Sequence, residues 1–392
     1  MDKVYFPNLN GLRFIAAFLV IIHHLEQFKS VLGMDNHWRN PFVSVIGPLG
    51  VILFFVLSGF LITYLLLAEE RKTGTIAIRK FYIRRILRIW PLYYLIVLAG
   101  FLILNRVPFL HIGTLSDNVW TDGAAKLVLF ILFLPNIAYA LFLPVPFISQ
   151  SWSVGVEEQF YLVWPVLIKK AKDKQRLLYA IIGGYLLIKF FLLLAHRLHS
   201  TNTIEMILGI WGNFSIDCMA IGGIFALYLF RDDRKLRVIF SRAVQFGVVA
   251  VLIVLLALGR VIPYIHNEVY GLLFAVLIVN LAANPKRIFS LEVSWLNYLG
   301  KISYGLYMYH PLAIIAGLRS LELLGIHNVP VQYIVCIIFT ILLAAVSYEL
   351  FEKRYIRMKT KFSEVISGEN ALATEQPTTK TILLKNHESN TL

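Results

Sequence analysis

Residues 45–67 read "VIGPLGVILFFVLSGFLITYLLL", a run that contains no charged side chain. An α-helix rises 1.5 Å per residue, so about 20 apolar residues cross the roughly 30 Å hydrocarbon core of a bilayer. A transmembrane β-barrel would instead show short segments in which polar and apolar residues alternate. The run therefore predicts a membrane-spanning helix.

Apolar runs of similar length recur along the whole chain. The 392 residues are 58% hydrophobic and 15% charged, with a mean hydropathy of +0.71, whereas soluble domains are nearer half apolar and a quarter charged. The sequence predicts an all-α, polytopic integral membrane protein with about ten transmembrane helices. The expected spans are 9–28, 45–67, 87–104, 153–168, 177–195, 208–230, 243–262, 268–283, 296–318 and 330–350.

The region 105–168 contains two apolar pieces that compete for one crossing. We assign the crossing to 153–168 and expect a re-entrant or broken segment near 125–150, because "KLVLFILFLPNIAYALFLPVPFI" carries three prolines. Broken backbone is tolerated at membrane depth where protein or water covers it. The alternative is eleven spans with one basic loop outside.

Basic loops set the expected topology. The net charge of +14 is concentrated in stretches between the apolar runs, and such stretches face the cytoplasm. Both termini are then cytoplasmic, in a multi-pass protein of the inner (cytoplasmic) membrane. The charge needs no nucleic-acid partner, and nothing in the pattern indicates an oligomeric state. We expect one membrane domain over 1–355 and a cytoplasmic, disordered tail over 356–392, which is polar and shows little periodicity.

Polar residues at opposite ends of the first span are the first functional candidates. Arg13 and His24 are eleven residues apart, about three helical turns, so they share one face roughly 16 Å apart. Charged side chains within a span are costly and usually face a protein interior. His23 points about 100° away from His24, and we expect it to contribute less.

Two further charged motifs lie beside later spans. Arg85 and Arg88 are neighbours at i, i+3 on a helix, and their planar forks suit either a phosphorylated cofactor or lipid headgroups. Glu157 and Glu158 adjoin the span at 153–168. A carboxylate at this depth needs a partner, and a His–Glu pair is a workable general base.

The remaining candidates are polar residues inside apolar runs, which we expect to line a pocket because burying them is costly. Ser58 also suits close helix packing. The two cysteines lie in different runs without metal-site spacing, so no metal is expected. These candidate substrate-binding residues are Ser58, Asp217, Ser303, Tyr304 and His310.

The motifs together resemble the acyltransferase-3 family of integral membrane O-acyltransferases. The similarity runs in order over about residues 5–355. The stretches that carry it are "NGLRFIAAFLVIIHH", "GVILFFVLSGFLIT", "FYIRRILRIWPLYY", "SWSVGVEEQFYLVWP" and "ISYGLYMYHP". One departure is Ser215, two positions before Asp217, where the family commonly has a basic residue.

The resemblance implies transfer of an acyl group, usually acetyl from acetyl-CoA, to a hydroxyl of an extracytoplasmic carbohydrate or lipid-linked glycan. Arg85 and Arg88 would serve the acyl-CoA donor, and His24 would be catalytic. Glu158, rather than Glu157, is expected to face the pocket as the second catalytic group. Membrane lipid is a further partner. The competing hypothesis is a transporter or proton-coupled carrier with an intramembrane His/Glu/Arg site, although no inverted repeat is visible.

Overall fold

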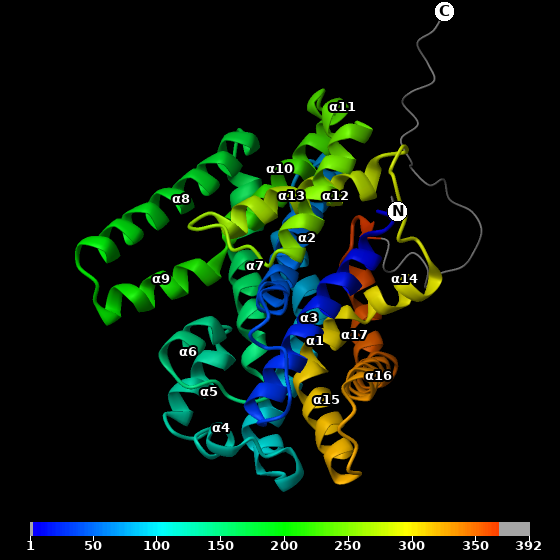
Figure 1. Ribbon diagram of the computed structural model, residues 1–392. Coiled ribbons are helices and arrows are strands. Elements are labelled where there is room, and N and C mark those ends of the chain that lie inside the picture. The colour runs from blue at the N-terminus through cyan, green and yellow to red at the C-terminus, as the bar shows by residue number, and fades with distance from the viewer. Residues whose placement is uncertain (1–2, 368–392) are drawn as a thin grey trace, which may run out of the picture.

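The computed structural model describes residues 3–367, and residues 368–392 of the predicted tail lie outside this part. The described chain is helical apart from one short parallel strand pair, which joins its two ends (Figure 1). The helices of the first half are α1 (Leu9–Val31), α2 (Pro41–Thr73), α3 (Ile78–Leu102), α4 (Gly113–Asp117), α5 (Gly123–Ile131), α6 (Pro135–Leu141), α7 (Trp152–Lys170) and α8 (Lys174–Leu198).

The second half continues in the same way. Its helices are α9 (Asn202–Phe214), α10 (Ile216–Arg231), α11 (Lys235–Ile239), α12 (Arg242–Ala257), α13 (His266–Ala283), α14 (Ser294–Lys301), α15 (Ser303–Leu323), α16 (Val329–Ser347) and α17 (Lys353–Lys359). Seven helical stretches that the structure describes are long and apolar enough to cross a membrane: α1, α2, α3 with the turn that follows it, α8, residues 202–231 (α9 and α10 together), α13, and residues 329–362, which begin with α16. Helices α7, α12 and α15 lie where three more of the membrane spans were predicted. The all-α, polytopic membrane architecture is confirmed.

Helix α2 forms the centre of the bundle and packs against α1, α10 and α13. Its contact with α10 depends on glycine. A Cβ atom added at Gly59 would lie 1.9 Å from the Met219 carbonyl oxygen, and one at Gly222 would lie 2.2 Å from that of Val56. Such close backbone approach is a common way for helices to associate in lipid. In α2, 78% of the apolar 18-residue stretch is buried inside the protein, whereas in α8 the corresponding share is 11%. Figure 1 shows α8 and α9 projecting from one side of the bundle.

The broken segment expected near 125–150 is confirmed. Helices α5 and α6 are separated by a turn in which Phe133 has a φ of 57°. Pro135 starts α6, where its missing N–H is not needed. Protein satisfies the Phe133 carbonyl oxygen in this turn, because the Gln159 side chain donates to it at 3.0 Å.

Two predicted spans are interrupted at positions that carry no proline. The run 208–230 is divided into α9 and α10 at Ser215, which has a φ of 29°. The run 296–318 is divided at Ile302 into α14 and α15. In both places the chain changes direction without a proline, so tertiary packing has overridden a continuous apolar pattern.

The C-terminal part of the described chain folds back onto the N-terminus. After α16, a π-helical turn (Tyr348–Glu352) leads into α17, and β2 (Ile366–Ser367) then pairs in parallel with β1 (Lys3–Val4). Arg84 of α3 donates to the Phe362 carbonyl oxygen at 2.8 Å and forms an ion pair with Glu69 at 2.9 Å. The start of the predicted tail, residues 356–367, is therefore packed against the bundle.

Candidate active site

A cavity of about 130 Å³ lies among α1, α2, α3, α7 and α15. Its polar lining includes six of the residues predicted from the sequence: Arg13, Ser58, Arg85, Arg88, Ser303 and Tyr304. Residues far apart in the chain thus meet at one place. The cavity also contains Glu157, Tyr161 and Tyr307, and the rest of its wall is mainly apolar.

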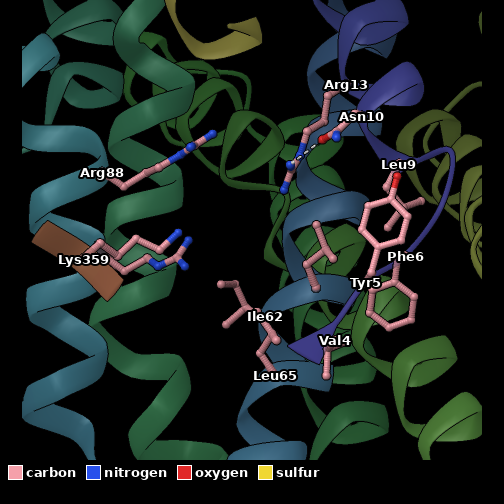
Figure 2. Close-up of a pocket in the computed structure, with 12 residues that line it drawn as sticks. Val4, Tyr5, Phe6, Leu9, Asn10, Arg13, Ile62, Leu65, Arg88 and Lys359 are labelled. Atoms are coloured by element: carbon pink, nitrogen blue, oxygen red, sulfur yellow. Dashed lines mark hydrogen bonds between the residues drawn. The ribbon is translucent and has the colours of Figure 1, made fainter. Parts of the chain in front are cut away.

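A second hollow of about 70 Å³ adjoins the first and shares its three arginines. Figure 2 shows Arg88 and Lys359 reaching in from one side and Arg13 from the other. Arg13 also donates to the Asn10 side chain at 3.4 Å. Lys359 is only 3% exposed and comes from α17, within the predicted tail, so the sequence offered no reason to place it here. The combined lining is strongly cationic.

Glu157, and not Glu158, lines the cavity, which reverses the order expected from the sequence. Residues 154, 157 and 161 of α7 share one helical face and line the cavity together. Glu158 instead faces α3, where Trp90 Nε1 donates to its Oε2 at 2.9 Å. Adjacent residues point about 100° apart, and the sequence did not reveal the rotation of α7 about its axis.

A short hydrogen-bonded chain fixes the carboxylate inside the cavity. Tyr161 donates to Glu157 Oε2 at 3.1 Å, and Ser58 Oγ lies 2.5 Å from the same tyrosine hydroxyl. The Arg85 guanidinium stands over the Tyr161 ring, 5.4 Å from its centroid. Arg85 Nε is buried without a hydrogen-bond partner among the described residues. Leaving such a buried donor unsatisfied is costly.

His24 lies beyond the cavity lining, next to His310 of α15. Their ring centroids are 4.8 Å apart. His24 Nδ1 donates to the Val20 carbonyl oxygen at 3.0 Å, and His310 Nδ1 donates to that of Tyr307 at 2.6 Å. His23 is bonded elsewhere, to the Val43 carbonyl oxygen at 2.7 Å. The structure thus brings two predicted site residues together outside the cavity.

Tyr307 connects the cavity with the histidines. Its ring lines the cavity, and its hydroxyl lies 2.6 Å from Ser153 Oγ and donates to the Gln150 carbonyl oxygen at 2.7 Å. One helical turn later on α15 stands His310, whose ring centroid is 5.7 Å from that of Tyr307. Sequence reasoning missed Tyr307, although its spacing from Ser303 and His310 already placed it on their helical face.

Asp217 is not brought to the cavity. It lies in the first turn of α10, fully buried, with Oδ1 unpartnered among the described residues. Its charged neighbours are Glu268 and Lys189, which form an ion pair at 2.6 Å. Within residues 3–367, no group of three or more metal-ligating side chains could hold a metal ion.

Comparisons with known proteins identify the family of the chain. A family model described as an acyltransferase domain matches residues 6–349. The chain is 27% identical to the peptidoglycan O-acetyltransferase OatA of Listeria monocytogenes over 331 residues, covering 79% of this chain and 49% of the relative. It is 29% identical to the O-acetyltransferase OatA of Staphylococcus aureus over 363 residues, covering 89% of this chain and 57% of the relative.

The chain therefore spans about half the length of these curated relatives. No solved structure matches it. The family match covers most of the helical bundle, including α1, α2, α3, α7 and α15, which build the cavity. The chain belongs to the acyltransferase-3 family of membrane acyltransferases.

Proposed function

We propose that this protein transfers an acetyl group from cytosolic acetyl-CoA to a hydroxyl of an extracytoplasmic carbohydrate or lipid-linked glycan. The observation that carries the proposal is the cationic cavity that ends one helical turn from a pair of histidines. Family membership favours this reaction over the carrier hypothesis. The names of the relatives, which are O-acetyltransferases, support acetyl as the acyl group.

The donor end of the site is the region around Arg13, Arg85, Arg88 and Lys359. Coenzyme A carries several phosphate charges, and guanidinium forks bind phosphate through paired, charge-assisted hydrogen bonds. We place this end toward the cytoplasm, with both termini, because the basic loops predict that orientation. The thioester would then extend along the cavity toward Tyr307.

The transfer end is His24. Because its Nδ1 donates to a carbonyl oxygen, Nε2 of the neutral ring carries the lone pair. In direct transfer, Nε2 takes the proton of the acceptor hydroxyl while the hydroxyl oxygen forms a bond to the thioester carbon. The carbon–sulfur bond breaks, and the thiolate leaves and receives the proton from His24. The products are the acetyl ester and free coenzyme A.

Glu157 is the carboxylate of the cavity, and we assign to it the role that the sequence analysis expected of Glu158. Held by Tyr161, it would orient the acceptor or the thioester and balance the positive charge of the arginines. The alternative to direct transfer is a two-step scheme in which His24 itself is acetylated first. Incubation with labelled acetyl-CoA alone separates the schemes, because only the two-step scheme leaves label on His24.

The acceptor is tested by mass spectrometry of cell-surface glycans from cells with and without the protein. The proposal predicts O-acetyl groups that are lost with the protein and restored by the wild-type chain. A matched strain carrying His24→Ala should remain unacetylated while the protein accumulates normally in the membrane. Unchanged surface acetylation, together with no acetyl transfer by the purified protein, would contradict the proposal.

A further inference from the structure

The 70 Å³ hollow is the end of the site farthest from the histidines. Gly47 of α2 packs against His23, because an added Cβ atom there would lie 2.3 Å from the His23 ring. Later residues of α2 lie progressively farther from that point, and the lining of the hollow extends along α2 as far as Leu65. On α1 the hollow reaches Arg13 and residues before it, at the other end of the helix from the histidines.

The two ends of the described chain build the wall of this hollow together. Val4 and Tyr5 come from the N-terminal segment, and Lys359 comes from the end of α17. Pairing of β1 with β2 joins the two segments, and Arg84 holds the C-terminal one through its bond to the Phe362 carbonyl oxygen at 2.8 Å. All three wall residues lie outside the range 6–349 that matches the family model.

Lys359 adds a fourth cation to the three arginines of the site. Carboxylates of the protein already act on two of these arginines, since Glu157 has Arg85 among its charged neighbours and Glu352 has Arg88. Figure 2 shows Lys359 extending into the hollow alongside Arg88. The Lys359 side chain is only 3% exposed, and a buried cation of this kind is costly unless a charged partner compensates it.

The chemical order of coenzyme A fits the order of cations along the site. Starting from the thioester, the molecule consists of the pantetheine arm, a pyrophosphate and a ribose that carries a 3′-phosphate. With the thioester directed toward Tyr307, the pyrophosphate reaches the arginines that both hollows share. The 3′-phosphate then falls at the far end, beside Lys359. A phosphate monoester carries about −1.5 to −2 charges at pH 7, and lysine binds phosphate as a compact point charge.

We propose that Lys359 and the hollow walled by Val4 and Tyr5 form the subsite for the 3′-phosphate of coenzyme A. The protein then selects the complete nucleotide over donors that lack this group, such as dephospho-coenzyme A or phosphopantetheine. This inference rests on the proposed function. The subsite is remote from the reacting atoms and contacts the donor equally before and during transfer, so it lowers the KM for the donor and leaves kcat unchanged.

Two ligands that differ only in the 3′-phosphate test the subsite. Isothermal titration of the wild type in phosphatidylcholine nanodiscs should show a Kd for coenzyme A about 10- to 100-fold lower than that for 3′-dephospho-coenzyme A, the range for a hydrogen bond between charged groups. Lys359→Gln should remove this preference by weakening only the binding of coenzyme A. Arg85→Ala should weaken both ligands by similar factors, because its expected partner is the pyrophosphate.

Lys361→Met is the matched control. Lys361 is exposed, lies two residues after Lys359 in the same segment, and its loss changes the net charge equally. We expect its preference for coenzyme A to equal that of the wild type. Lys359→Arg, which keeps the charge, should retain the preference, and Lys359→Met should lose it. Thermal unfolding of every variant reports loss of fold separately, and the comparison of the two ligands on the wild type needs no variant.

Four results would overturn the inference. These are equal affinity of the wild type for the two ligands, an unchanged preference in folded Lys359→Gln and Lys359→Met, an equal loss of preference in Lys361→Met, and a preference that appears only when phosphatidylglycerol is added to the nanodiscs. The last result would assign the hollow to the phosphate of an anionic lipid headgroup.

Failure of the proposed function is distinguishable from these results. If the wild type transfers acetyl from acetyl-CoA and from acetyl-dephospho-CoA with the same KM, only the subsite is wrong. If the wild type binds coenzyme A but transfers acetyl from neither donor, the proposed function itself is wrong.

Discussion

Arg85 makes the sharpest prediction about the donor site. Its guanidinium lies in the cavity wall, stands over the Phe81 and Tyr161 rings at 5.7 and 5.4 Å, and has a buried Nε without a partner among the described residues. Arg85→Ala removes every donor of this group. Charge-assisted hydrogen bonds contribute about 1.5–3 kcal/mol, so the Kd for coenzyme A should rise by about 10- to 150-fold.

The assay is isothermal titration of the purified variants with coenzyme A. Arg85→Lys should restore only part of the affinity, because an ammonium keeps the charge but lacks the planar fork. Arg79→Ala is the control, since Arg79 is an exposed residue of the same helix and its removal changes the net charge equally. Equal affinity of Arg85→Ala and Arg79→Ala for coenzyme A would refute the reasoning. Arg85 would then serve only as one of the positive charges that set the orientation of the chain in the membrane.

The other predictions concern the carboxylate, the helix contact and the buried ion pair. Glu157→Gln should lower turnover more than Glu158→Gln in the acetyl-transfer assay, because only the first side chain lines the cavity. Gly59→Ala should destabilise the bundle by about 1–3 kcal/mol, since the added Cβ would meet a backbone carbonyl, whereas Gly183→Ala on lipid-facing α8 meets nothing within 4 Å and should not lower the Tm. Lys189→Met leaves its partner carboxylate on α13 unpaired and should cost about 3–5 kcal/mol, measured as a lowered midpoint of unfolding.

The prolines and apolar runs were enough to predict most of the fold. Three prolines in residues 125–148 indicated a broken segment, and the chain turns there at Phe133. The breaks at Ser215 and Ile302 could not be predicted in this way, because neither carries a local signal such as proline. Contacts between elements decide these positions. For example, Asn267 of α13 donates to Ser215 Oγ at 3.4 Å.

Part of the candidate site could also be predicted from local patterns in the sequence. Arg85 and Arg88 were found because their spacing places them together on one helix, and both line the cavity. Lys359 was missed because it is brought to the cavity by a tertiary contact of the C-terminal segment. The choice between Glu157 and Glu158 depends on how α7 is rotated about its axis, and this rotation is set by the neighbouring helices.

The central claim is that this chain itself carries an acetyl group from coenzyme A to a hydroxyl on the other side of the membrane, with His24 as the proton-accepting group. The most direct measurement uses purified protein in sealed vesicles, with labelled acetyl-CoA on the side that the arginines face and cell-wall glycan on the opposite side. We predict that label appears in alkali-labile esters on the glycan with the wild type, and that it does not with His24→Ala, although both bind coenzyme A equally. Label transfer by the His24→Ala protein, or none by a wild type that binds coenzyme A, would contradict the account.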